Sequence, residues 1–257
     1  MFANQTNSKP QLALAPATCL VEIRRTSTFP PPGESKFPSP PALPSALLRL
    51  ECSLSAFGAD LQDITDIIRS DIGLTTQLLR LAAREMEESP GRVVPISDIV
   101  VHVGLEKLKA LVAQTRALPD DVTGAAGLST GERFWMHSRL IALLAEEIAD
   151  RSSEIRIADA HMAGLLCHLG DLPLVMGWAA PGADARDCRQ IGYRMANAWG
   201  FPRVLAEVIS GDRGVCLTHE SRTLLDIVTS ADTWASRLKS LAVRESERRA
   251  STIHLVD

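Results

Sequence analysis

The sequence predicts an all-α protein, built as an irregular multi-helix bundle. Hydrophobic residues make up 46% of the 257 residues but aromatic residues only 4%, so Leu, Ile, Val and Ala must fill the core. This composition favours helix bundles, because β-sandwiches prefer aromatic and β-branched residues. From about residue 41 to residue 238, apolar residues recur at steps of three and four without an alternating strand pattern. A chain of this length forms one sizeable domain or two small ones.

Proline marks the first boundary. Eight of the fifteen prolines lie within residues 1–41, three of them in succession from Pro30. Such a stretch cannot hold a helix and tends to be extended. We therefore expect residues 1–40 to form a mobile Pro-rich arm, in which Cys19–Ile23 is a candidate for one short strand.

Short helices are expected in residues 41–118, which form a predicted N-terminal lobe. Two apolar helical faces are formed by Leu61, Ile64, Ile67 and Ile68 and by Leu74, Leu78 and Leu81. Ser97 is expected to cap a short helix that ends at Gly104, and another helix begins at Leu105. The stretch between residues 118 and 131 holds three glycines and a proline, which predicts a loop between two halves of the chain.

Longer helices are expected in residues 130–238. The first of them carries apolar or small residues at Phe134, Ser138, Ile141, Ala145 and Ile148. A second helix is expected from Ile157 to Met176, with an interruption near Pro173. Others are expected over residues 187–199, after Pro202 and over residues 224–238. Residues 239–257 form a polar tail that extends the last helix and then frays.

Eight short motifs follow one another along the chain. They are Leu43-Pro44, Ile67–Leu74, Leu78–Ala82, Ile99–Leu105, Phe134–Ser138, Gly164–Gly170, Trp199–Pro202 and Ala231-Asp232. In order and spacing these motifs resemble the HDOD family, bacterial signalling proteins whose domain is related to the HD phosphohydrolases. The resemblance covers residues 41–238. It implies an HD-superfamily-like bundle in two helical lobes, residues 41–118 and residues 130–238, and a regulatory role in signal transduction.

The same resemblance implies that the metal site of the HD enzymes is degenerate here. Those enzymes take a His from one helix, a His-Asp pair from the next and an Asp from a late helix. His137 and Asp232 match the first and last of these positions, but Cys167 and His168 replace the His-Asp pair. Three further family histidines are replaced by Cys188, Asp212 and Arg213. Since a metal-dependent hydrolase needs several converging ligands, we expect no catalysis, no bound metal and no cofactor.

Two alternatives to a non-catalytic module stay open. His137, Cys167, His168 and Asp232 are all candidate zinc ligands, so a divergent phosphohydrolase with a rebuilt mononuclear site is one alternative. In the simpler interpretation, the two histidines are hydrogen-bonded core residues, Cys167 is a small buried hydrophobe, and Asp232 pairs with a histidine or an arginine. The other alternative is a nucleotide-binding sensor with a basic pocket, for which the candidate residues are Arg139, Arg194 and Arg213.

Net charge, isoelectric point and cysteine content limit which partners and which cellular compartment we expect. A net charge of −4 and an isoelectric point near 5.9 argue against a nucleic-acid partner. Five irregularly spaced cysteines without a Cys-x-x-Cys motif indicate reduced thiols in the cytoplasm. No apolar run approaches the length of a membrane span. We expect a signalling protein partner, a small ligand or nucleotide as a further candidate, and a homodimer.

Several further single residues have structural interpretations. His161 opens a core helix and is expected to be exposed rather than to bind a metal. All four tryptophans lie in the second half of the chain and are expected to be buried anchors. These are Trp135, Trp178, Trp199 and Trp234.

Overall fold

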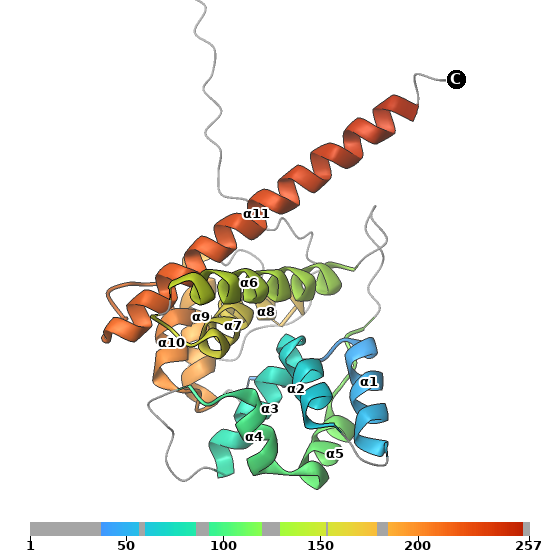
Figure 1. Ribbon diagram of the computed structural model, residues 1–257, viewed down its shortest axis with the longest axis vertical. Coiled ribbons are helices and arrows are strands. Elements are labelled where there is room, and N and C mark those ends of the chain that lie inside the picture. The colour runs from blue at the N-terminus through green and yellow to red at the C-terminus, as the bar shows by residue number, and fades with distance from the viewer. Residues whose placement is uncertain are drawn as a thin grey trace, which may run out of the picture.

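The computed structural model describes residues 37–56, 60–85, 93–119, 129–152, 154–178 and 185–253. It confirms the all-α fold, because the one β-type contact within these ranges is an isolated parallel bridge between Ala42 and Ala117. The helices form two lobes, α1–α5 and α6–α11 (Figure 1). Residues 1–36, including the expected strand at Cys19–Ile23, lie outside the described residues.

Five short helices build the N-terminal lobe. They are α1 (Pro44–Ser55), α2 (Leu61–Arg69), α3 (Ile72–Glu85), α4 (Ile96–Val103) and α5 (Leu105–Gln114). Ile64, Ile67 and Ile68 of α2 are buried as their spacing predicts. The expected cap at Ser97 is wrong, because α4 begins one residue earlier and the Ser97 hydroxyl donates to the side chain of Asp98 instead. The predicted end of α4 at Gly104 is confirmed.

Longer and more closely packed helices build the second lobe. They are α6 (Thr130–Ser152), α7 (Ile157–Leu166), the 3-10 turn η1 (Leu169–Asp171), α8 (Leu172–Val175), α9 (Ala185–Ala198), α10 (Arg203–Ile209) and α11 (His219–Ile253). The α6 helix packs against both α7 and α11. The helix expected from Ile157 to Met176 is interrupted earlier than Pro173, because α7 ends at Leu166. Pro173 lies in the first turn of α8, where a missing N–H costs nothing.

The last helix begins at His219, before the expected residue 224, and extends into the tail as expected. The α11 helix continues through residues 239–253, and its C-terminal end points away from the other helices (Figure 1). Trp234 lies on this helix and is 54% exposed, so the prediction that it is a buried anchor is wrong. Burial is confirmed for Trp135 and Trp199, which belong to the hydrophobic core, whereas Trp178 is half-buried at its edge.

Polar contacts join the two lobes where α2 meets α6 and α7. His161 of α7 is buried, so the expectation of an exposed side chain is wrong. Its Nε2 donates to the main-chain carbonyl of Arg69 at 2.8 Å, and its Nδ1 lies 3.3 Å from the carboxylate of Glu146. The guanidinium of Arg69 also pairs with Glu146. A buried histidine is tolerated here because both ring nitrogens have partners.

Candidate functional site

The candidate site lies where α6, α7 and α11 meet. The α6 helix carries His137, the turn after α7 carries Cys167 and His168, and α11 carries Asp232. Gly164 lets α6 and α7 approach closely, because a Cβ at this position would lie 3.0 Å from Cα of Ala142. The Gly-Leu-Leu frame of the motif therefore sets the distance between the helices that supply the first two groups.

Three of the four candidate metal ligands converge. Nε2 of His137 lies 3.4 Å from Oδ1 of Asp232, and Nε2 of His168 lies 3.3 Å from the same oxygen. The two imidazole rings are 5.5 Å apart between centroids. One ligand atom from each of the three residues lies within 4.8 Å of the others. We call this group the His-His-Asp cluster.

Cys167 lies outside the cluster. Its thiol donates to the main-chain carbonyl of Gly164 at 3.2 Å, as side chains in the last turn of a helix commonly do. Burial raises the pKa of the Cys167 thiol to about 11. Because its Sγ is turned to Gly164, Cys167 does not contribute a ligand atom to the His-His-Asp cluster. Cys167 is half-buried and packs against the hydrophobic core, so its interpretation as a small buried hydrophobe fits only in part.

The sequence interpretation missed one member of the site, Asp171. Its Oδ2 lies 2.9 Å from Nδ1 of His168, so the His168 ring is flanked by carboxylates on both nitrogens. The spacing of three residues was the available signal, since it brings two side chains of one helical turn together. Asp171 also accepts a hydrogen bond from the Cys188 side chain.

The charges of the cluster support one another. Burial opposes the charged form of His168, but the carboxylates of Asp171 and Asp232 outweigh it and hold the pKa of His168 well above its usual value. Burial likewise opposes ionisation of Asp232, but the imidazoles of His137 and His168 beside it hold the pKa of Asp232 well below its usual range. The favoured state is therefore an ionised carboxylate beside a protonated His168.

The other family positions do not join the cluster. Cys188 is buried on α9, and its main chain packs directly on Gly170, where any side chain would overlap the Cys188 carbonyl. Oδ1 of Asp212 accepts from the N–H of Gly214, and Arg213 pairs with Asp226 of α11. Arg213 is therefore turned to another carboxylate and does not lie against the cluster. It lines a separate surface pocket.

The three arginines of the nucleotide alternative come together only in part. Arg194 and Arg213 line this same pocket, and Arg189 joins them. Arg139 on α6 is not among the lining residues. Arg189 was not singled out from the sequence, although it lies five residues before Arg194 on one helix.

A comparison with protein families decides the identity of the domain. The HDOD domain model matches residues 41–180, which include the motif around Cys167 and His168. The chain belongs to the HDOD family. The matched range ends before Asp232 and before the pocket arginines, so these positions lie outside the part that the family model covers.

Solved structures show the same fold as this HDOD chain. A fragment of the MmoQ response regulator from Methylococcus capsulatus is 19% identical, with a TM-score of 0.60 over 82% of this chain and 90% of that one. A virulence factor from Campylobacter jejuni is 14% identical, with a TM-score of 0.54 over 82% of this chain and 88% of that one. At these identities the likeness concerns the fold alone.

One curated relative matches by sequence. An uncharacterized protein of Treponema pallidum is 29% identical over 136 residues, which are 51% of this chain and 25% of that protein. The HDOD chain thus spans about a quarter of the length of this relative. Among the described helices, none combines the length and the apolar character needed to cross a membrane.

Proposed function

We propose that this HDOD protein is a regulatory module of bacterial signal transduction, and that its HD-type site does not hydrolyse phosphate esters. The observation that carries the proposal is the position of His168. An imidazole stands where HD enzymes have a carboxylate, and its ring is flanked by Asp171 and Asp232. The description of its structural neighbour MmoQ as a response regulator supports the signalling role.

The chemistry of the cluster argues against hydrolysis. A two-metal site needs a carboxylate that bridges the ions and a free position for the attacking water. The cluster holds one carboxylate, Asp232, which lies against two imidazoles. Asp171 faces the other side of the His168 ring, and the Cys167 thiol is turned to the Gly164 carbonyl. Such a site has too few anionic ligands for a pair of ions.

Restoring the HD pair tests this proposal. The parent chain and the double variant Cys167→His/His168→Asp are purified, and bound manganese, iron and zinc are measured together with hydrolysis of bis(p-nitrophenyl) phosphate. We expect no hydrolysis by the parent chain and a gain of metal in the double variant. Hydrolysis by the parent chain that disappears in Asp232→Ala would overturn the proposal. Circular dichroism of each variant checks that the helices remain.

A second candidate function is a mononuclear metal centre at the same cluster. Nε2 of His168 is buried without a hydrogen-bond partner, although it lies near Oδ1 of Asp232. Two imidazoles and one carboxylate are a known ligand set for zinc and for non-haem iron. His137, His168 and Asp232 would hold the ion, which would supply Lewis acidity when bound.

Zinc titration separates the two candidates. Binding of one zinc per chain in the parent, lost in His137→Ala and kept in the His102→Ala control, would establish the metal centre. His102 suits this control because it is exposed and lies in α4 of the other lobe. Binding by neither the parent nor the variants would leave a hydrogen-bonded cluster that supports the fold.

Location and partners complete the proposal. The described cysteines are free, which supports a reducing cytoplasm. The module acts on a partner protein, and it forms a homodimer. Size-exclusion chromatography with light scattering tests the dimer, and a monomer across the micromolar range would overturn it.

A further inference from the structure

A surface pocket of about 630 Å³ lies between α9 and the loop that joins α10 to α11. The helix contributes Arg189, Gln190, Tyr193 and Arg194, which lie within two turns of one another. The loop contributes Asp212 and Arg213 among others. Pockets of about 300 to 1,000 Å³ are typical of small-molecule sites.

The charge of this pocket is available to a ligand. Within the described part of the chain, neither Arg189 nor Arg194 makes a hydrogen bond or an ion pair, and both side chains are exposed. Arg213 pairs with Asp226, so its charge is partly balanced. Asp212 is the one carboxylate in the lining, and its Oδ1 already accepts from the N–H of Gly214. Two unpaired guanidinium groups thus face a common space.

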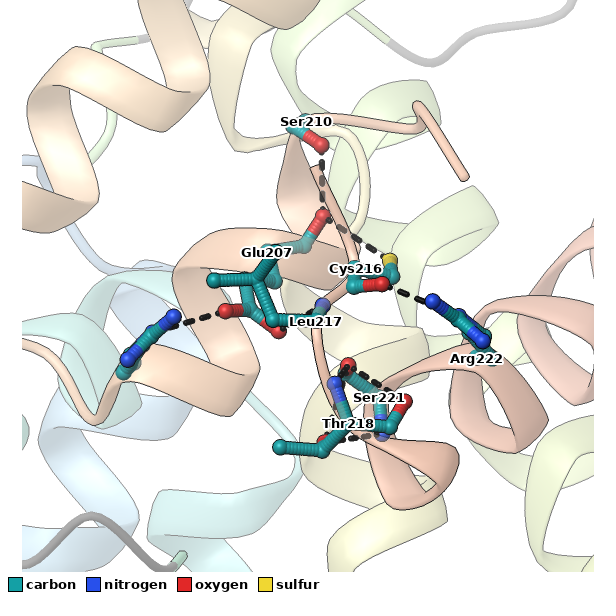
Figure 2. A network of polar contacts seen from close by, with 8 residues as sticks. Glu207, Ser210, Cys216, Leu217, Thr218, Ser221 and Arg222 are labelled. Carbon is teal, nitrogen blue, oxygen red and sulfur yellow. Dashed lines mark hydrogen bonds and ion pairs between the residues drawn. The ribbon is translucent and has the colours of Figure 1, made fainter. Parts of the chain in front are cut away.

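The loop from Ser210 to Val215, which lines the pocket, is held in place by the buried Glu207 of α10. Figure 2 shows its main-chain carbonyl accepting from the Ser210 hydroxyl and the Cys216 thiol. The two distances are 2.6 Å and 3.7 Å. Its carboxylate accepts from the N–H of Leu217 at 3.1 Å. Both ends of the loop are therefore held to α10. A ligand meets a wall that is already formed, which reduces the entropy lost on binding.

Gly211 allows the side chain of Arg189 to pack closely against the loop. Its φ of 62° lies in the left-handed region that favours glycine, and a Cβ there would lie 2.9 Å from Cδ of Arg189. The stem of Arg189 therefore packs on the Gly211 backbone. Packing of this stem limits the conformations of the side chain and positions its guanidinium at the pocket.

We propose that this pocket binds a nucleoside phosphate. Guanidinium groups bind phosphate oxygens through paired N–H donors, which suits Arg189 and Arg194. Tyr193 lies between these two arginines in the sequence and is 37% exposed. Its ring offers a face for stacking of a base. The volume exceeds what a phosphate alone needs. This site is separate from the His-His-Asp cluster, so the proposal does not rest on whether the cluster binds metal or catalyses.

Calorimetric titration of the full chain tests the pocket. The probes are AMP, GMP, ATP and GTP, with pyrophosphate and guanosine as the partial ligands. We expect at least one nucleotide to bind one site with a submillimolar Kd. The double variant Arg189→Gln/Arg194→Gln is expected to weaken binding by about tenfold or more, which corresponds to about 1.4 kcal/mol. Tyr193→Ala is expected to weaken the nucleotide but not pyrophosphate.

Matched controls keep the outcome decisive. Arg139→Gln removes an exposed arginine outside the pocket and is expected to leave the Kd unchanged. His137→Ala is also expected to leave it unchanged, which separates this site from the cluster. The proposal is overturned by absence of binding up to about 5 mM of every nucleotide. It is also overturned by full binding in the double variant, or by pyrophosphate binding as tightly as the nucleotides.

Discussion

Nε2 of His168 lies 3.3 Å from Oδ1 of Asp232, and this contact links the turn after α7 to the last helix. The resemblance to the HD enzymes implies a carboxylate at the position of His168, where the group would repel Asp232 unless a cation lay between them. The imidazole removes that repulsion, because a protonated His168 attracts the Asp232 carboxylate directly. On the correspondence that the HDOD resemblance implies, we propose that His168 supplies from the protein a positive charge that a metal supplies in the enzymes.

Removal of the Asp232 charge is expected to lower the pKa of His168. In Asp232→Asn the imidazolium loses one of its two flanking carboxylates, and Asp171 remains. NMR titration of the His168 ring in both proteins measures the shift. The exposed Asp150 of α6 provides the control variant Asp150→Asn, which is expected to leave the titration unchanged. An unchanged His168 pKa in Asp232→Asn would contradict the direct attraction.

The sequence identified the residues of the His-His-Asp cluster, but it did not show how the neighbouring side chains are oriented. The motif positions made His137, His168 and Asp232 candidates for one site, and their ligand atoms lie within 4.8 Å of one another. Cys167 was a candidate ligand beside His168, but adjacent residues on a helix point about 100° apart. Its thiol therefore turns back to Gly164 while His168 faces the cluster. Local sequence pattern alone does not show which of two neighbours faces inward.

Burial of polar side chains was harder to predict than burial of apolar ones. The α2 isoleucines were predicted from their spacing, because an apolar stripe must face the core. His161 was expected to be exposed, since nothing near it in sequence indicates a partner. Its partners, Arg69 and Glu146, lie on two other helices, one of them in the other lobe. Contacts between lobes depend on packing that periodicity does not encode.

The lobe contact at His161 is expected to contribute to stability. His161→Ala removes the hydrogen bond to the Arg69 carbonyl and the contact with Glu146, and leaves buried polar groups without partners. The expected loss is about 2–4 kcal/mol in the free energy of unfolding. Urea denaturation measures it. His102→Ala, at an exposed position, is expected to change stability by less than about 0.5 kcal/mol. Equal effects of the two substitutions would contradict the role of His161.

Asp71 is expected to make the stability depend on pH. Its carboxylate is fully buried and accepts from the N–H groups of Leu43 and Leu74 at 2.8 and 2.9 Å. Burial raises the pKa of Asp71 from 3.8 to about 6, although these hydrogen bonds oppose the rise. The folded state therefore binds a proton more tightly than the unfolded state, so this contribution is complete below pH 3.8 and lost as the pH rises through about 6.

Comparison with Asp71→Asn isolates that contribution, because the amide does not titrate. Between about pH 4 and pH 7, the parent chain is expected to lose up to about 3 kcal/mol relative to the variant. Urea denaturation of both proteins across this range measures the difference. A difference that is independent of pH, or that favours the parent chain at higher pH, would contradict the raised pKa of Asp71.

Gly170 is expected to be the least replaceable residue of the Gly-Leu-Leu-x-x-x-Gly motif. A Cβ at this position would overlap the carbonyl oxygen of Cys188 and lie 2.8 Å from the main-chain nitrogen of Gly192. Both obstacles are backbone atoms of α9, so relief requires the whole helix to move. Gly170→Ala is therefore expected to cost about 3 kcal/mol or more, at or above the upper end for overpacked cores.

Gly177→Ala provides the matched comparison for this substitution. Gly177 has a φ of 66° but no atom within 4 Å of an added Cβ, so its cost comes from the backbone conformation alone. That cost is about 1–2 kcal/mol. Thermal and urea denaturation of both variants compare the two effects. An equal or smaller loss in the free energy of unfolding for Gly170→Ala than for Gly177→Ala would contradict this explanation. Close contact between η1 and α9 would then not be the reason for a glycine at position 170.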